Sequence, residues 1–187
     1  MLLRLIDDIN RALENDCFFS ALSLALTLPD ICGKAKYPDE KSNKNRYIAW
    51  YDEYVGSYEK YPGRDSKVPY LSGEVVYSLR CSFLHQGNPS IEKDKIKDEC
   101  CKIDNFTLLV EKKKEYNVLL DSASISENYI NDRKVGNTQR SYEVNVRRLC
   151  FILSACASGY YKEYKEQFCF FDFQIVDLDE RYAAIRN

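Results

Sequence analysis

The sequence predicts a mainly α-helical single domain, a helical bundle with a small β-hairpin or sheet appended in its second half. Apolar residues recur at helical spacing through most of the first 90 residues, and β-prone runs begin only after residue 100. A length of 187 residues suits one domain with a sizeable core. We therefore expect one unit over 1–187, with a helical bundle core at 1–90, a β-rich insertion at 100–146, and a terminal helix and tail at 147–187.

The first two helices follow from apolar spacing. Residues 2–14 carry leucines and isoleucines at nearly helical intervals, which predicts an amphipathic helix. The run 17–28 is apolar nearly all round, as in a helix that is buried on most sides. Asp16 is its predicted N-cap, and Pro29 and Gly33 are predicted to end it.

The remaining elements alternate between helical and turn signals. Ser72, followed by an acidic first turn, is a good N-cap for a fourth helix, and Gly87-Asn88-Pro89 is a stop signal. The predicted boundaries are a loop over 34–45, a helix over 46–55, a loop over 56–70 and a helix from Ser72 to about Gln86.

In the second half, two β-prone runs flank a charged turn, which predicts a hairpin. The alternation of Tyr142, Val144 and Val146 with polar residues predicts another short strand. The predicted ranges are a hairpin of 106–110 and 116–120 around 111–115, a helix over 147–165, and a strand or extended arm over 168–178.

The overall charge excludes some classes of function. With 27 Lys and Arg against 29 Asp and Glu, the net charge is −2 and the pI about 5.6, so no global field attracts nucleic acid. RNA binding would need a local basic patch, completed by a second subunit. The sequence has no Gly-rich phosphate loop, so nucleotide hydrolysis has no support and no cofactor is expected. The 15 Tyr residues favour either half-buried interfaces or an ordinary core edge.

The eight cysteines predict neither zinc binding nor a disulfide framework. No Cys-x-x-Cys pair occurs and the chain has one histidine, whereas zinc sites use closely spaced ligand pairs. We therefore expect no metal. The N-terminal segment is too charged for a signal peptide, and no apolar run is long enough to cross a bilayer. We expect a cytoplasmic protein with reduced thiols and no membrane contact.

The fourth helix carries the best functional candidates, Arg80 and His85. On a wheel of 100° per residue, Val75, Val76, Leu79 and Phe83 form the core side. Arg80 lies on one flank of the opposite half and His85 on the other, and a long guanidinium can span the gap toward a shared ligand. Tyr77, Cys81 and Leu84 lie between them and are candidate interface residues. Candidate supporting polar residues are Glu74, Ser78 and Ser82.

An Arg followed after four residues by a His, near the end of a helix in a helical domain, resembles the Arg-x4-6-His signature of the HEPN superfamily. The segments 21–30, 46–51 and 79–87 are also similar to bacterial and phage proteins with this motif, so the likeness covers mainly residues 1–90. Many active members have a polar residue directly after the Arg. This chain has Cys81 there, and Ser82 or Glu74 would have to take that role.

The resemblance implies a homodimer formed through the motif helix and a metal-independent endoribonuclease, such as a toxin or an antiphage effector with a partner antitoxin. His85 would be the general acid or base, and Arg80 would stabilise charge on the scissile phosphate. Two alternatives stay open. The same face could be a non-catalytic dimerisation or binding module. His85 could also lie near the helix C-terminus simply because the helix dipole favours a cation there, while Arg80 pairs with a surface carboxylate. Arg147 and Arg148 are weaker candidates for phosphate contacts.

Overall fold

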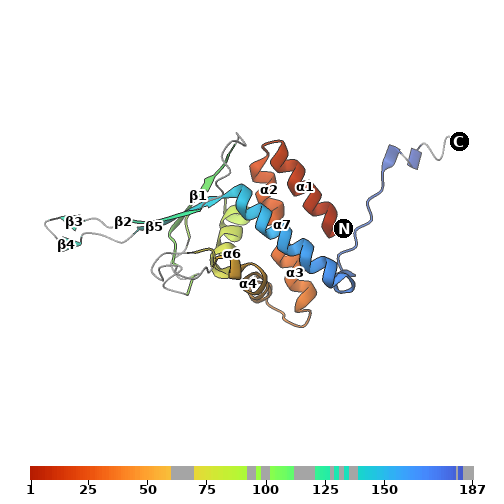
Figure 1. Cartoon of the computed structure of the whole chain (residues 1–187), viewed down its shortest axis with the longest axis horizontal. Helices are drawn as coiled ribbons and strands as arrows, with labels where there is room; N and C mark the ends of the chain where they lie inside the picture. The colour runs from red at the N-terminus through yellow and green to blue at the C-terminus, as the bar shows by residue number, and fades with distance from the viewer. Residues whose placement is uncertain are drawn as a thin grey trace.

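The computed structural model describes residues 1–59, 70–91, 96–97, 102–111, 121–126, 129–130, 133–134, 139–179 and 181–182. It confirms the predicted fold class: helices pack into a bundle, and a small sheet extends from one end (Figure 1). The helices are α1 (Leu2–Glu14), α2 (Phe18–Ala25), α3 (Leu28–Lys36), α4 (Asn43–Tyr54), α5 (Gly56–Glu59), α6 (Gly73–Cys81), the π-helical turn η1 (Ser82–Gln86), α7 (Val146–Glu163) and the 3₁₀ turn η3 (Lys165–Phe168).

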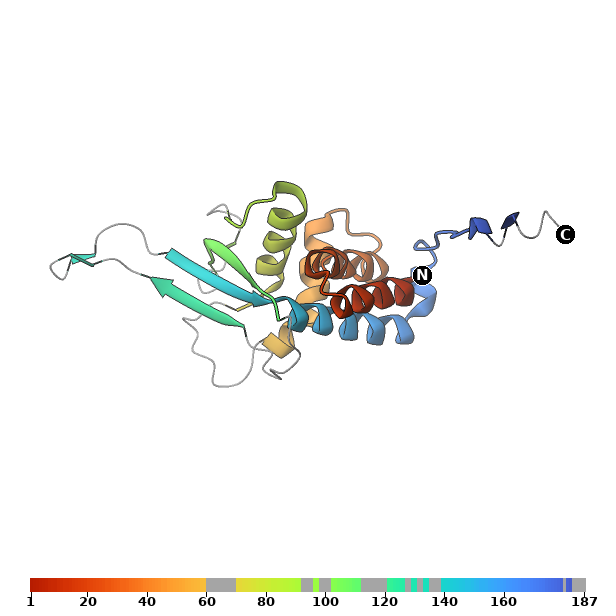
Figure 2. The same cartoon turned by 90° about the horizontal axis from the view of Figure 1, so that it is seen from above.

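The sheet has β5 at its centre, parallel to β1 and antiparallel to β2. The strand predicted around Tyr142 is therefore present, but the first predicted hairpin strand pairs with it rather than with a neighbour along the chain. The second predicted hairpin strand, 116–120, lies outside the described residues. The strands are β1 (Asn105–Leu109), β2 (Ser122–Ser126), β3 (Tyr129–Ile130), β4 (Arg133–Lys134) and β5 (Gln139–Asn145), and β3 pairs with β4 away from the bundle (Figure 2).

Helix α7 completes the bundle that the first 90 residues begin. It packs against α1, α2 and α3, and its residues Leu149, Leu153 and Ala157 are fully buried. These side chains recur every four residues, so they form one stripe that faces the core. Helices from both ends of the sequence thus share a single hydrophobic core.

Several predicted boundaries are wrong in the first half. The buried run after residue 17 forms two helices, because Pro29 lies in the first turn of α3, where its missing N–H costs nothing. Part of the predicted loop after Gly33 is therefore helical. Asp16 does not cap α2: it adopts a left-handed backbone (φ 56°) at the turn, and Cys17 is the N-cap. The predicted loop after residue 55 also begins with a short helix, α5.

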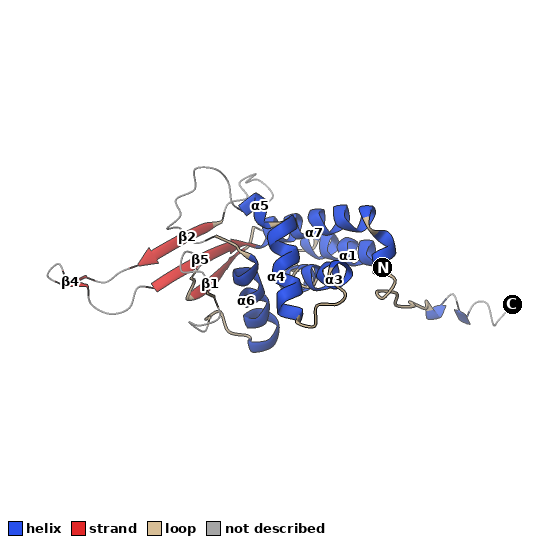
Figure 3. Ribbon diagram, turned by 90° about the horizontal axis from the view of Figure 1, so that it is seen from below, coloured by secondary structure: helices blue, strands red, loops and turns tan. Residues whose placement is uncertain are grey.

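Helix α4 lies between α3 and α6, and two glycines allow this close packing (Figure 3). A Cβ at Gly33 would lie 2.7 Å from the carbonyl oxygen of Arg46, and one at Gly73 would lie 2.9 Å from that of Ile48. Either contact would force the backbones apart. Because both helices approach α4 so closely, residues near Gly33 and residues of α6 can meet across one end of α4.

The different burial of the cysteines leads to a prediction of how fast each thiol reacts. Cys17 and Cys169 are exposed, whereas Cys32 and Cys150 are buried, and burial raises the pKa of the Cys150 thiol to about 12. The thiolate is the reactive form, so we expect iodoacetamide at pH 8 to label the exposed pair within minutes and the buried pair only after unfolding. Peptide mass spectrometry measures this directly. Labelling of Cys150 as fast as Cys17 in the native protein would contradict the packing of α7.

Candidate functional site

The motif helix consists of α6 and η1. As predicted, Ser72 caps it: its hydroxyl accepts a hydrogen bond from the backbone N–H of Val75 at 3.4 Å. Val75, Val76 and Leu79 are buried, which agrees with the predicted core side, while Phe83 is half-buried and stacks on Phe19. The helix ends at Gly87, whose left-handed backbone (φ 60°) closes the last turn.

Arg80 and His85 are brought together by η1. In a regular α-helix, residues five apart point about 140° away from each other, at 100° per residue. The π-helical turn has i→i+5 hydrogen bonding, so it shifts His85 back toward the face of Arg80. Nη1 of Arg80 lies 3.3 Å from Nε2 of His85, and the His85 side chain is exposed. A helical wheel for a regular α-helix placed Arg80 and His85 on separate flanks. The π-helical turn η1 corrects that expectation.

A carboxylate from another helix holds the guanidinium. Nε of Arg80 donates a hydrogen bond to Oδ2 of Asp30 at 2.7 Å, with side chains that are 19% and 25% exposed. Burial raises the pKa of the Asp30 carboxyl, although the adjacent Arg80 acts in the opposite direction. For Arg80, burial alone would lower the pKa, but the charge and hydrogen bond of Asp30 raise it. The pair is thus fixed and only partly desolvated.

Tyr77 forms the floor beside Arg80. Its ring centroid lies 5.7 Å from the Arg80 guanidinium and 6.0 Å from the ammonium of Lys44, which comes from the first turn of α4. The ring centroids of Tyr47 and Tyr77 are 5.2 Å apart, and the two rings are steeply inclined at 71°. Two cations therefore lie within about 6 Å of one half-buried aromatic ring, and this local positive charge suits a phosphate.

The other predicted interface residues, Cys81 and Leu84, are also half-buried on the motif helix. Cys81 lies beside Tyr77, and together with burial it raises the pKa of the Tyr77 phenol. Tyr77, Cys81 and Leu84 thus form a surface that the protomer covers only in part. Whether a second protein chain binds there stays a prediction.

The predicted supporting polar residues do not join the Arg80–His85 pair. Ser78 is buried and its hydroxyl donates to the carbonyl of Glu74 at 2.8 Å. Ser82 is also buried, and its hydroxyl points to the carbonyl of Ser90 at 3.5 Å. The Glu74 carboxylate accepts a hydrogen bond from the backbone N–H of Lys97 at 3.0 Å. These side chains therefore form hydrogen bonds with backbone groups around the motif helix.

Sequence reasoning missed Asp30, which lies fifty residues before Arg80. The only local signals were its acidic charge in a helical first turn and its position one turn before Gly33. The weaker candidates Arg147 and Arg148 are engaged elsewhere. Arg147 binds Asp16, and Arg148 binds two carboxylates below the sheet.

Comparison with protein-family models, curated proteins and solved structures gives no match for this chain. Among the described residues, no helix combines the length and the apolar character needed to span a membrane. In the same part of the chain, no three His, Cys, Asp or Glu side chains gather as metal ligands would.

The geometry can support proton transfer next to a bound anion. A guanidinium only donates hydrogen bonds, so the contact with Arg80 is a hydrogen bond only in the tautomer whose Nε2 carries no proton. In that tautomer, Nε2 can accept a proton from a hydroxyl group once the Arg80 guanidinium turns from it to a bound oxyanion. The remaining donors of Arg80 can bind an oxyanion beside it.

Proposed function

We propose that the protein is a metal-independent endoribonuclease with Arg80 and His85 as its catalytic residues. The observation that carries the proposal is the 3.3 Å contact between Arg80 Nη1 and His85 Nε2, with the guanidinium held from behind by Asp30. The contact places an exposed proton acceptor beside a fixed cation. The resemblance of Arg80-x4-His85 to the HEPN signature supports the same conclusion.

RNA supplies its own nucleophile, so these two residue types are sufficient. His85 accepts the proton of the ribose 2′-hydroxyl as the 2′-oxygen bonds to phosphorus. The bond from phosphorus to the 5′-oxygen breaks, and the departing oxygen takes a proton from an imidazolium. Arg80 binds the non-bridging phosphate oxygens, whose charge grows in the transition state. The products are a 2′,3′-cyclic phosphate and a free 5′-hydroxyl.

The proposed active form is a homodimer that pairs through the motif helix. Tyr77, Cys81 and Leu84 would face the second copy, and the two His85 rings would divide the two proton transfers. Lys44 adds the local positive charge that an acidic chain needs for RNA binding. An antitoxin that covers this face would silence the enzyme, which fits a role as a toxin or an antiphage effector.

The test is incubation of wild type and of His85→Ala with a mixed RNA pool in the presence of EDTA. We expect wild type to leave 2′,3′-cyclic phosphate ends, read by end-specific ligation and mass spectrometry, and the variant to leave none. Because His85 is exposed, its replacement should not change the fold, and far-UV circular dichroism is the control. Products with 3′-hydroxyl ends, or equal cleavage by the variant, would refute the assignment.

Absence of cleavage by a folded, dimeric wild type would favour the alternative, a non-catalytic binding module. One observation already fits that alternative, since Arg80 has a carboxylate partner within its own chain. In that case Leu84→Asp should abolish pairing, while His85→Ala should leave it unchanged. Sedimentation velocity distinguishes these results.

A further inference from the structure

The C-terminal arm, residues 169–179, carries more exposed apolar surface than any other described segment of similar length. Phe173, Ile175, Val176 and Leu178 are 55–66% exposed. Residues 171–177 form neither helix nor strand, so the arm itself does not bury these side chains. Exposed apolar residues that gather in one segment are typical of a surface that another chain covers. The described part of the arm's own protomer does not provide that cover.

The arm is anchored at its root and then leaves the molecule. Phe168 is buried against Tyr160 and Tyr161, and the ammonium of Lys34 lies 4.8 Å from the ring of Phe170. Beyond this point all three views show the chain running away from the bundle (Figures 1, 2 and 3). Residues 169–179 contain no Gly or Pro that would favour a reversal of direction. The arm thus leaves the bundle of its own protomer instead of folding back on it.

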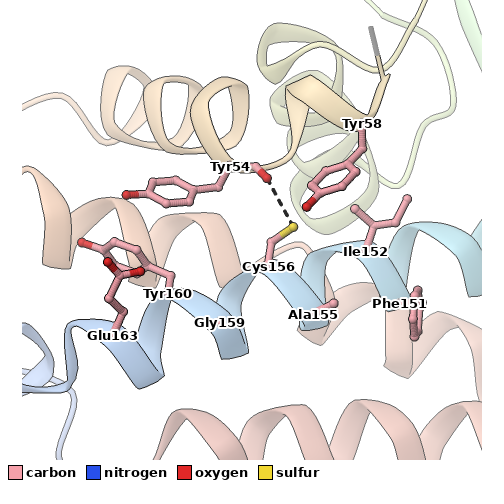
Figure 4. Close-up of a pocket in the computed structure, with 9 residues that line it drawn as sticks. All are labelled: Tyr54, Tyr58, Phe151, Ile152, Ala155, Cys156, Gly159, Tyr160 and Glu163. Carbon is pink, nitrogen blue, oxygen red and sulfur yellow. Dashed lines mark hydrogen bonds between the residues drawn. The ribbon is translucent and has the colours of Figure 1, made fainter. Parts of the chain in front are cut away.

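An apolar groove lies along the outer face of α7, next to the root of the arm. It has a volume of about 430 Å³, and Tyr54 and Tyr58 line its side opposite α7 (Figure 4). Tyr160 and Glu163 lie at one end of the groove (Figure 4), and Tyr160 also contacts Phe168 at the arm's root. Phe151, at the other end, is 66% exposed.

The floor of the groove is open because α7 has small residues there. Ala155 and Gly159 are exposed, and a Cβ added at Gly159 would meet no atom within 4 Å. A larger residue at position 159 would clash with nothing in the protomer. Glycine in a helix interior also destabilises the helix by about 1 kcal/mol relative to alanine. The packing of a single copy therefore does not explain why the floor of the groove has no large side chains.

We propose that two copies of the chain pair by arm exchange, with the arm of each lying in the α7 groove of the other. The groove begins at Tyr160, where the arm departs, so a two-fold axis near this point sends each arm directly into its partner's groove. The arm would span up to about 36 Å if fully extended, whereas the ten residues of α7 from Phe151 to Tyr160 span about 14 Å.

The area that this exchange would bury approaches that of a stable pair. At about 150 Å² for each large side chain and an exposure of 55–66%, the four apolar residues of the arm contribute about 360 Å² per copy, and the groove walls that they cover add a similar area. A stable interface needs about 800 Å² per partner. One arm in one groove would bury less than this area, so a stable pair requires that both arms be exchanged.

The experiment is sedimentation equilibrium of the full chain and of two variants, one on each side of the contact. In the Leu84→Asp background, which removes pairing through the motif helix, we expect the chain still to dimerise, and Phe173→Asp in the arm and Gly159→Leu in the groove each to raise the dissociation constant at least about 30-fold, as hot-spot residues do. Gly159→Leu favours helix, so unchanged far-UV circular dichroism excludes misfolding. Asn10→Leu, on the exposed side of α1, adds the same side chain elsewhere and should pair like wild type.

This contact does not depend on the proposed ribonuclease activity, and Leu84→Asp on the motif helix separates the two. Pairing that is lost in Leu84→Asp but unchanged in Gly159→Leu would overturn arm exchange. A wild type that stays monomeric at all concentrations would overturn it as well, because the arm would then have no second copy to enter.

Discussion

Replacing Arg148 with methionine should lower the free energy of unfolding by about 3–5 kcal/mol, as loss of one partner of a buried ion pair does. Nη2 of Arg148 lies 2.7 Å from Oε1 of Glu59, and Nη1 lies 2.6 Å from Oδ2 of Asp121. The two carboxylate side chains are only 3% and 7% exposed. Methionine conserves most of the volume, so the loss would come from removing the guanidinium that both buried carboxylates contact. These contacts join α5, the start of β2 and α7.

Urea denaturation measures the effect, and Arg147→Met is the matched control one residue earlier. Arg147 pairs with Asp16, whose side chain is 47% exposed, so its ion pair contributes about 1 kcal/mol or less. Replacing both Glu59 and Asp121 by their amides in the Arg148→Met background should recover part of the loss, because neutral side chains are cheaper to bury. A loss below about 1 kcal/mol for Arg148→Met would mean that water reaches the two carboxylates.

The second large effect is expected on catalysis. His85→Ala should lower the single-turnover rate of RNA cleavage by about 10²–10⁴-fold, and Arg80→Ala by about 10²–10³-fold. The double variant should be little worse than His85→Ala, since the two side chains act together on one phosphate. Asp30→Asn keeps the shape but weakens the hold on the guanidinium, so its effect should be smaller than that of Arg80→Ala.

The rates should be measured on a short RNA with EDTA and enzyme in excess. Arg80→Lys is the informative conservative change: it keeps the charge but not the planar fork that contacts Asp30 and His85 together, so we expect it to resemble Arg80→Ala. Arg147→Met should cleave like wild type. Losses that simply multiply in the double variant would show that the two residues act independently, contrary to the 3.3 Å contact.

Several elements could be predicted from the sequence because their signals are local. The amphipathic spacing of α1, the Ser72 cap and the stop at Gly87 each depend on a few neighbouring residues, and all three are present. The alternation around Tyr142 likewise identified β5. Pro29 shows the limit of such signals. It fits the end of one helix and the first turn of the next, and only packing against α4 decides between them.

For the candidate site, the sequence was enough to identify the candidate pair: Arg80 and the single histidine, His85, five positions apart near a helix end. Tertiary structure decided how they meet. The π-helical turn brings the two side chains together, and the close approaches at Gly33 and Gly73 bring Asp30 to Arg80. Spacing along the chain specifies a residue's place within its own helix, whereas contacts between helices depend on packing across a core that distant segments build together.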